Sequence, residues 1–279
     1  MTQTTTHEPT FLQKLLGKNY KWWFLLVFNL KRVNASPFAW ISGYLSQGLL
    51  ALTIVYVWFL GGANTGTLTY LAVGKVFYSI ITVNGYNYLA QQIETGKISN
   101  LLLLPSPFFR LTFFYLLGTR LLKNLALTIG VLIGVFVAIL TFTRFDIPEI
   151  SAVLILIFYF LPIGFILQYF LGMAVGSFNF FINDKRDYEG LISSYTAIFT
   201  ILSGTVIPLD KLPNNLINIV QLLPTSWLLH HPMQVYLGKY SPLETFYVFL
   251  GGIFWCFVLY LLAKLVFKLG LKRNEAVGL

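Results

Sequence analysis

The feature that most constrains this sequence is its series of long apolar stretches, which match the thickness of a lipid bilayer. A helix needs roughly 20 apolar residues to cross a hydrocarbon core about 30 Å thick. The chain of 279 residues is 57% hydrophobic and only 10% charged, whereas soluble domains carry about 25% charged residues. Too little polar surface is available to cover a soluble fold of this size. The sequence therefore predicts an all-α, polytopic membrane protein.

Six of these stretches are long enough to form transmembrane helices. We place the six predicted spans at Pro37–Leu60, Leu68–Ala90, Leu121–Phe142, Ile150–Phe178, Leu191–Ile207 and Thr245–Phe267. The spans predict three regions: a cytoplasmic tail with an interfacial helix at 1–36, a six-span domain at 37–268, and a cytoplasmic tail at 269–279.

The N-terminal region contains one apolar run, Trp22–Leu30, which is too short to cross a bilayer. Basic residues flank this run on both sides; they are Lys14, Lys18, Lys21, Lys31 and Arg32. A short apolar run with basic flanks is typical of an amphipathic helix that lies on a membrane surface. We therefore predict an N-terminal interfacial helix.

The basic residues are distributed unevenly between the two predicted sides of the membrane. With the N-terminus inside, 15 of the 19 Lys and Arg residues fall in inner segments, and only Arg144, Lys211 and Lys239 fall in outer ones. Because basic residues concentrate in cytoplasmic loops, both termini are predicted to be cytoplasmic. The net charge of +9 then complements anionic lipid head groups and does not indicate nucleic-acid binding.

The longest predicted outer loop, residues 208–244, contains five prolines but remains apolar over 215–223 and 227–237. Prolines interrupt helices, and apolar runs are unfavourable in water. We therefore expect short re-entrant helices in the outer leaflet between the fifth and sixth spans. Trp227, Tyr236 and Tyr240 are amphipathic and are expected at the level of the head groups.

The sequence contains no recognisable catalytic, cofactor or metal site. It has no Gly-x-x-x-x-Gly-Lys-[Ser/Thr] loop for phosphates and no His-Glu-x-x-His motif. The adjacent pair His230-His231 lacks neighbouring carboxylates in the sequence, and Ser203-Gly204 has no histidine in another span to activate the serine. The single cysteine, Cys256, excludes an internal disulfide. We therefore expect that the chain is not an enzyme.

Polar residues inside the predicted spans mark a possible transport path or subunit interface. The candidates are Lys75, Asn84 and Asn87 in the second span, and Ser193, Ser194 and Ser203 in the fifth. Charged groups within a bilayer are costly and are often functional. Hydroxyl and amide groups also hydrogen-bond between packed helices, so a purely structural role is the alternative.

A polar segment, residues 91–107, separates the second and third spans. Its sequence, with Ile93-Glu94-Thr95-Gly96-Lys97-Ile98 followed by Leu101 to Pro107, resembles the segment after the second span of ABC-2 type transporter permeases. A second similarity runs from Leu202 to Pro213, through Leu223-Pro224, to Tyr236-Leu237-Gly238, and a third covers the basic C-terminal tail. Together the similarities extend over nearly the whole chain.

The resemblance implies a permease subunit that contacts a separate ATP-hydrolysing subunit through the segment after the second span. The residues implied to couple the two are Ile93, Glu94, Thr95, Gly96, Lys97, Ile98, Leu101 and Leu102. It also implies two ATPase copies that carry ATP and Mg, and a second permease subunit of the same or a similar kind. The expected location is a prokaryotic plasma membrane.

The function expected from this resemblance is ATP-driven transport. Most members of the family are exporters, and the predicted outer loop favours export of a hydrophobic or amphipathic substrate. An ATP-independent channel or scaffold protein is the alternative that fits the same composition. A membrane-embedded enzyme would need ionisable groups that converge within the spans, where Lys75 is the main candidate.

Overall fold

The computed structural model describes residues 37–142, 149–182 and 184–276, and every regular element within them is helical. The predicted interfacial helix lies outside the described residues. The α-helices are α3 (Pro37–Leu60), α4 (Thr65–Ile81), α5 (Gly85–Glu94), α6 (Ile98–Leu102), α7 (Phe108–Phe142), α8 (Ile150–Ile155), α9 (Leu161–Ser177), α10 (Lys185–Leu202), α11 (Asn214–Val220), α12 (His230–Tyr236) and α13 (Pro242–Ala276).

Five helical stretches of the described residues are long and apolar enough to cross a membrane. They are Ile41–Leu60, Thr65–Glu94, Phe108–Leu140, Ile150–Phe180 and Pro242–Arg273. These agree with the first, second, third, fourth and sixth predicted spans. The first and last of them leave most of their apolar side chains partly or fully exposed, as lipid-facing helices do, whereas Thr65–Glu94 is half buried inside the bundle.

The fifth predicted span, Leu191–Ile207, does not reach the expected length as an apolar helix. The helix α10 begins with the charged residues Lys185, Arg186 and Asp187, and it ends at Leu202. Gly204 follows with a φ of +84°, a left-handed conformation that commonly ends a helix. The observed helix, Lys185–Leu202, therefore begins and ends several residues earlier in the chain than the predicted span.

The second span is not one continuous helix, as the sequence had predicted, but is broken between α4 and α5. The helix α4 ends at Ile81, and α5 begins at Gly85. The side-chain amide of Asn124 in α7 donates hydrogen bonds to the carbonyl oxygens of Ile80 (3.1 Å) and Thr82 (2.6 Å). Since a backbone carbonyl without a partner is costly in a membrane, Asn124 stabilises the break.

The third span begins earlier in the chain than predicted. The helix α7 starts at Phe108, so Arg120 and Lys123 lie within a helix and not in a loop that precedes it. In the fourth span, α8 and α9 are joined by a π-helical turn, Leu156–Phe160. Pro162 follows this turn, and its ring cannot fit a regular helical turn, which accounts for the irregularity.

Glycines bring α3 and α7 unusually close together. A Cβ atom added at Gly48 would lie 2.7 Å from the carbonyl oxygen of Gly130, and one added at Gly130 would lie 2.5 Å from that of Tyr44. A Cβ atom at Gly134 would collide with the backbone of Gly48. Gly130 and Gly134 are one helical turn apart, the spacing of small residues at close helix–helix crossings in membranes.

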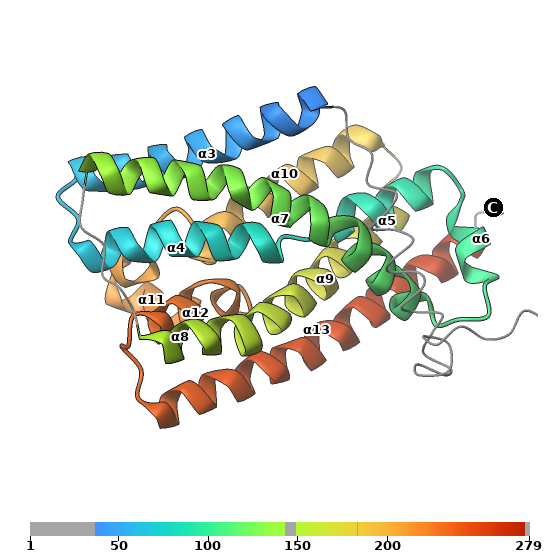
Figure 1. Cartoon of the computed structure of the whole chain (residues 1–279). Helices are drawn as coiled ribbons and strands as arrows, with labels where there is room; N and C mark the ends of the chain where they lie inside the picture. Colours follow the sequence, from blue (N-terminus) through green and yellow to red (C-terminus); the bar gives the residue numbers. More distant parts are fainter. Residues whose placement is uncertain (1–36, 143–148, 183, 277–279) are drawn as a thin grey trace, which may run out of the picture.

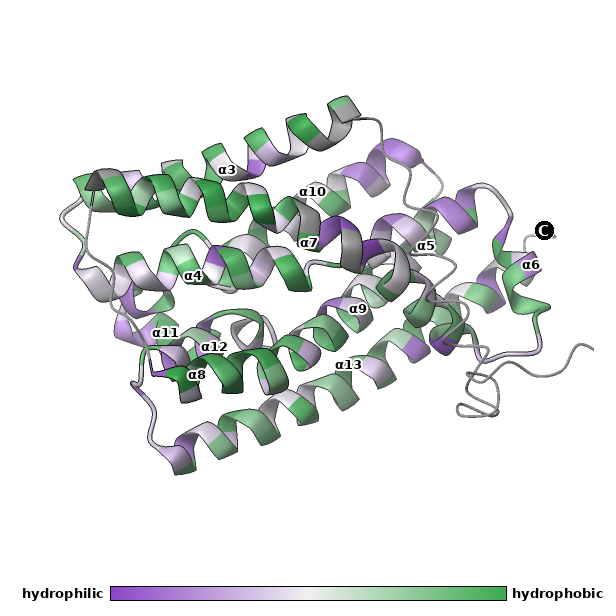
Figure 2. Cartoon of the chain, in the orientation of Figure 1, coloured by the Kyte–Doolittle hydropathy of each residue, from purple (hydrophilic) through white to green (hydrophobic). Residues whose placement is uncertain are grey.

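The helices form a bundle with distinct structures at its two ends (Figure 1). The short helices α5 and α6 lie at one end, together with the C-terminal end of α13, whereas α8, α11 and α12 lie at the other. Hydrophilic residues are frequent on α5 and in the first turns of α10, and the central parts of the long helices are mostly apolar (Figure 2). The predicted coupling segment and the long predicted outer loop are thus at opposite ends.

The segment between α10 and α13 folds into short helices, as expected, but most of it is covered by the chain itself. In α12, residues from His230 to Val235 are buried. Trp227 is only 9% exposed, and its indole N–H donates to the Val248 carbonyl oxygen at 2.7 Å. The Trp227 side chain is therefore covered by the protein and is not exposed to lipid head groups. Exposed large apolar residues of this segment gather in and next to α11, where they include Leu216, Ile219 and Leu222.

Candidate functional site

The predicted coupling residues form an exposed turn between α5 and α6. The chain reverses at Gly96, which has a φ of +68°, and Thr95 closes the end of α5 through a 2.6 Å hydrogen bond from its hydroxyl to the Gln91 carbonyl oxygen. Glu94, Thr95, Gly96 and Lys97 are all exposed. The coupling segment therefore consists of the end of α5, this turn and the short helix α6.

The apolar residues around this turn face in different directions. Ile98 is buried to 2% exposure in the cluster that also contains Leu89 and Met173, and Ile93 packs partly against the same cluster. Leu101 is half-buried and Leu102 is exposed. Beyond α6, Leu103 is 82% exposed. The structure thus gives Ile98 an internal packing role, and it places Leu102, Leu103 and Leu104 on the outer surface.

The helix that carries the turn is held firmly against α9. A Cβ atom added at Gly176 would lie 2.9 Å from Tyr86 Cα, so the two backbones are in close contact. Two further side chains bind α5, one from the turn after α9 and one from the first turns of α10. Asn179 donates to the Ala90 carbonyl oxygen at 3.3 Å, and the Tyr188 hydroxyl donates to that of Tyr86 at 3.1 Å. A force on the turn would therefore be transmitted to α9.

The six polar residues predicted to mark a path or interface do not gather at one place. Lys75 and Asn84 line a shared cavity between α3, α4 and α7. Asn87 is exposed on α5, and Ser193 and Ser194 are exposed on α10. Ser203 is fully buried, and its hydroxyl donates to the Thr200 carbonyl oxygen at 3.2 Å, which is a structural role at the end of α10.

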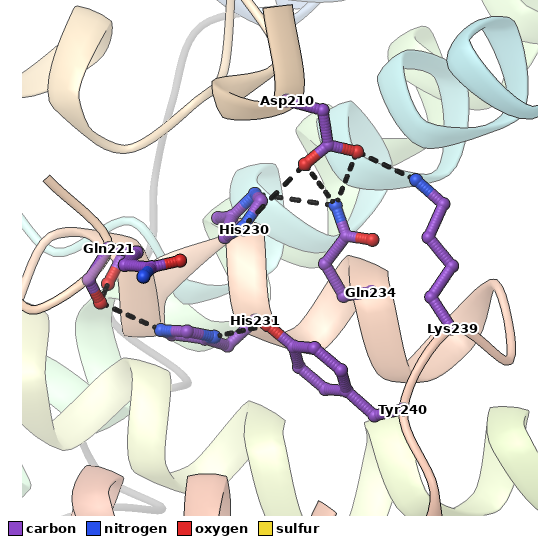
Figure 3. A network of polar contacts seen from close by, with 8 residues as sticks. Asp210, Gln221, His230, His231, Gln234, Lys239 and Tyr240 are labelled. Atoms are coloured by element: carbon purple, nitrogen blue, oxygen red, sulfur yellow. Dashed lines mark hydrogen bonds and ion pairs between the residues drawn. The ribbon is translucent and has the colours of Figure 1, made fainter. Parts of the chain in front are cut away.

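A polar network that the sequence analysis missed lies at the opposite end of the bundle (Figure 3). The Asp210 carboxylate accepts hydrogen bonds from Gln234 (2.9 Å to each oxygen) and from Lys239 (2.7 Å), and it lies 3.8 Å from His230 Nε2. No local signal could have revealed this, because Asp210 precedes the histidines by a whole short helix.

The second histidine of the pair has different partners. His231 lies 2.9 Å from the Tyr240 hydroxyl and 2.9 Å from the Gln221 carbonyl oxygen. The two histidines therefore connect α12 to three other parts of the segment between α10 and α13 (Figure 3). Among the described residues, no group of three or more His, Cys, Asp or Glu side chains is arranged to hold a metal ion. The network joins the short helices to one another.

Burial and neighbouring charges shift the pKa values of the ionisable groups in this network. Burial, with the neighbouring His231, lowers the pKa of His230 from 6.5 to about 4, although Asp210 opposes this shift. Burial also lowers the pKa of His231, which the Gln221 carbonyl opposes. For Asp210, burial raises the pKa, but hydrogen bonds from Lys239 and Gln234 outweigh it and the net shift is downward. At neutral pH both histidines are uncharged, and Asp210 is ionised.

Acid is expected to lower the stability of the segment between α10 and α13. Because the folded pKa of His230 lies below its ordinary value, the unfolded chain binds a proton first as the pH falls, and stability is lost between about pH 6.5 and pH 4. Between pH 7 and pH 5 this amounts to about 2 kcal/mol. Thermal unfolding of the full chain in neutral detergent should show the loss, and His230→Gln should remove most of it. An equal pH dependence in that variant and the wild type would contradict this explanation.

Comparison with known proteins identifies the chain's relatives. A family model of ABC-2 family transporter proteins matches residues 40–278, which include nearly all of the described helices. No curated protein matches the sequence. The match agrees with five apolar helices long enough to cross a membrane and with the resemblance in the segments that follow the second and fifth predicted spans. The chain therefore belongs to the ABC-2 transporter family of multi-pass membrane proteins.

Proposed function

We propose that this protein is the transmembrane permease subunit of an ATP-driven transporter and that the turn between α5 and α6 couples it to a separate ATPase subunit. ABC-2 permeases generally work with ABC ATPase partners. On this proposal, ATP and Mg bind to the partner, and the present chain carries the transport path without catalysing a reaction itself.

The observation that carries this proposal is the exposed apolar tip formed by Leu102, Leu103 and Leu104. These side chains are 41%, 82% and 44% exposed, and they follow the exposed charges of Glu94 and Lys97 in the chain. Apolar anchors with a polar rim are the usual composition of a protein–protein contact. The tip is attached to α5, which α9 holds in place, so a partner that binds there can move the transmembrane helices.

We further propose that α10 also crosses the membrane, as the fifth of six spans, and that both termini are cytoplasmic. The described part of the C-terminal tail and the α5–α6 turn lie at the same end of the bundle (Figure 1), as a common cytoplasmic side requires. The first turns of α10 carry the exposed pair Lys185 and Glu189, 3.9 Å apart, which suits a position at the membrane edge. A prokaryotic plasma membrane is the proposed location.

The complete transporter is proposed to contain two permease chains, identical or similar, and two ATPase chains. The first span supports this assembly because only 11% of the residues in its most apolar stretch are buried within the chain. The exposed serines Ser193 and Ser194 give α10 a surface of small side chains, which permits close approach of a second helix. These two surfaces are the proposed contacts between permeases.

The proposed direction of transport is export, and the proposed substrate is hydrophobic or amphipathic. The outer end supports this because α11 presents Leu216 and Ile219 to its surroundings, at 51% and 63% exposure. An apolar surface beside the outer leaflet suits a substrate that leaves toward lipid.

A substitution at Leu103 tests the proposed contact with the ATPase. In Leu103→Asp, a carboxylate would have to be desolvated at the contact, so we expect at least a tenfold loss of ATPase activity that co-purifies with the tagged full chain. The conservative change Leu103→Met should retain the activity, because methionine preserves the apolar surface.

A matched control is Leu222→Asp, which changes a leucine of 64% exposure in the segment after α11, at the other end of the bundle. It should retain the co-purifying ATPase. If Leu103→Asp also retains it at the wild-type level, the contact lies elsewhere. If the wild-type chain elutes without any ATPase from cells that produce it naturally, an ATP-independent channel or scaffold becomes the better explanation.

A further inference from the structure

A cavity of about 280 Å³ between α3, α4 and α7 has three basic side chains in its wall. Lys75 comes from α4, and Arg120 and Lys123 come from α7. The sequence predicted Lys75 inside the second span, whereas Arg120 and Lys123 lie at the start of the third predicted span. In the structure the three surround the same space, although 45 residues or more separate Lys75 from the other two in the chain.

These positive charges are not neutralised within the described part of the chain. Neither Lys75, Arg120 nor Lys123 forms an ion pair there, and no carboxylate lines the cavity. A charged side chain at the centre of a bilayer costs about 3 kcal/mol on insertion scales. Like charges that face one small space also repel one another, and the surrounding helices screen them poorly. An anion that entered the cavity would therefore be strongly attracted.

The remaining polar groups of the wall can donate hydrogen bonds to such an anion. Gln47 of α3 contributes a carboxamide, and Asn84 lies at the break between α4 and α5. The Asn84 side chain makes no capping hydrogen bond to α5, so its amide remains available. In contrast, the Asn124 amide donates both of its described hydrogen bonds to carbonyl oxygens at the break. Asn124 therefore holds the backbone that forms this side of the cavity.

The cavity also borders apolar surface that faces the membrane. Leu50, which lines it, is 45% exposed, and its neighbour Leu49 is 61% exposed. An amphipathic molecule could therefore place a charged group among the basic residues while its acyl chain lies along α3. A small free anion would gain nothing from this surface, so the arrangement favours a lipid.

We propose that this cavity binds the anionic phosphate group of a membrane lipid or of a lipid-like substrate. The guanidinium of Arg120 can hold two phosphate oxygens at once, and the lysines add ammonium donors. If the lipid is itself transported, the site would select the substrate of the transporter, and that extension alone rests on the proposed function.

Native mass spectrometry of the full chain in a neutral detergent tests the proposal without ATP or a partner. Titration with phosphatidylglycerol should show at least tenfold tighter binding than titration with zwitterionic phosphatidylcholine. The double variant Lys75→Gln/Arg120→Gln should lose at least tenfold in affinity for phosphatidylglycerol. The control Lys264→Gln/Lys268→Gln, which removes the same charge from α13, should bind within twofold of the wild type.

Two further measurements keep the outcome decisive. Lys123 is exposed, so Lys123→Gln should fold normally and still weaken binding about threefold, even if the double variant unfolds. Inorganic phosphate is titrated alone and as a competitor. Displacement of the lipid by millimolar phosphate would overturn the lipid assignment, and wild-type affinity in both cavity variants would overturn the site. Neither result would affect the test of coupling at Leu103.

Discussion

Replacing Gly134 with leucine is expected to separate α3 from α7 and to prevent the transmembrane bundle from folding. A Cβ atom there would meet the Gly48 backbone, including its carbonyl carbon at 2.9 Å. Because the obstacle is backbone on a neighbouring helix, rotation of a side chain cannot relieve the clash. Overpacking of this kind costs about 3 kcal/mol or more. We expect loss of the monodisperse peak in detergent gel filtration and a sharply lowered unfolding temperature.

The glycine at position 190 provides a matched control. It lies within α10, and a Cβ atom added there would meet nothing within 4 Å. Gly190→Leu should therefore fold as the wild type does, or gain up to about 1 kcal/mol from its higher helix propensity. The smaller change Gly134→Ala should already destabilise the protein. If Gly134→Leu unfolds at the wild-type temperature, α3 and α7 are not packed as described.

The second large effect is expected from Ile98→Asp, which should unfold the end of the bundle that carries the coupling turn. Ile98 is 2% exposed and belongs to the cluster that contains Leu89 and Met173. Loss of its buried side chain and burial of a polar group should together cost about 3–5 kcal/mol. Limited proteolysis at Lys97 and thermal unfolding in detergent would measure the change.

The comparison with Leu103→Asp separates folding from coupling. Leu103 is 82% exposed, so its replacement should change stability by no more than about 0.5 kcal/mol. Both variants should lose the ATPase partner, but only Ile98→Asp should lose the folded end. Any variant that includes Ile98→Asp, such as one with Asp at both Ile93 and Ile98, would lose the partner through unfolding. Such a variant therefore cannot test the partner contact by itself. Proteolysis of Leu103→Asp as fast as that of Ile98→Asp would contradict the assigned burial.

The sequence predicted the positions of most helices because their apolar length is a property of local sequence. The first span was predicted with the observed bounds, Pro37–Leu60. The break in the second span escaped prediction because Thr82 and Val83 do not interrupt the apolar pattern. Its stabilising partner, Asn124, is on another helix. Average hydropathy over a window does not reveal a hydrogen bond between helices.

The candidate sites show the same limit. The coupling segment was recognised from its local polarity and its resemblance to a family, but the sequence did not show that Ile98 faces inward while Leu103 faces outward. Lys75 was predicted inside the second span, but Arg120 was counted only as a charge on the inner side, so the cavity that they share was missed. Its formation depends on how α4 packs beside α7, which no short sequence pattern specifies.

The break at 82–84 divides the second span between two neighbours. Before the break, α4 packs mainly on α7, and α7 packs on α3. After the break, α5 packs mainly on α9, and α9 packs on α13. The short segment between them therefore joins two groups of helices, which α7 also connects, because the Tyr169 hydroxyl of α9 donates to the Phe109 carbonyl oxygen at 2.7 Å. If the proposed coupling is correct, a push on the turn after α5 would act first on α9 and α13. Thr82 and Asn84 of this segment line the cavity together with the three basic side chains, so a movement of the segment would change the shape of that cavity.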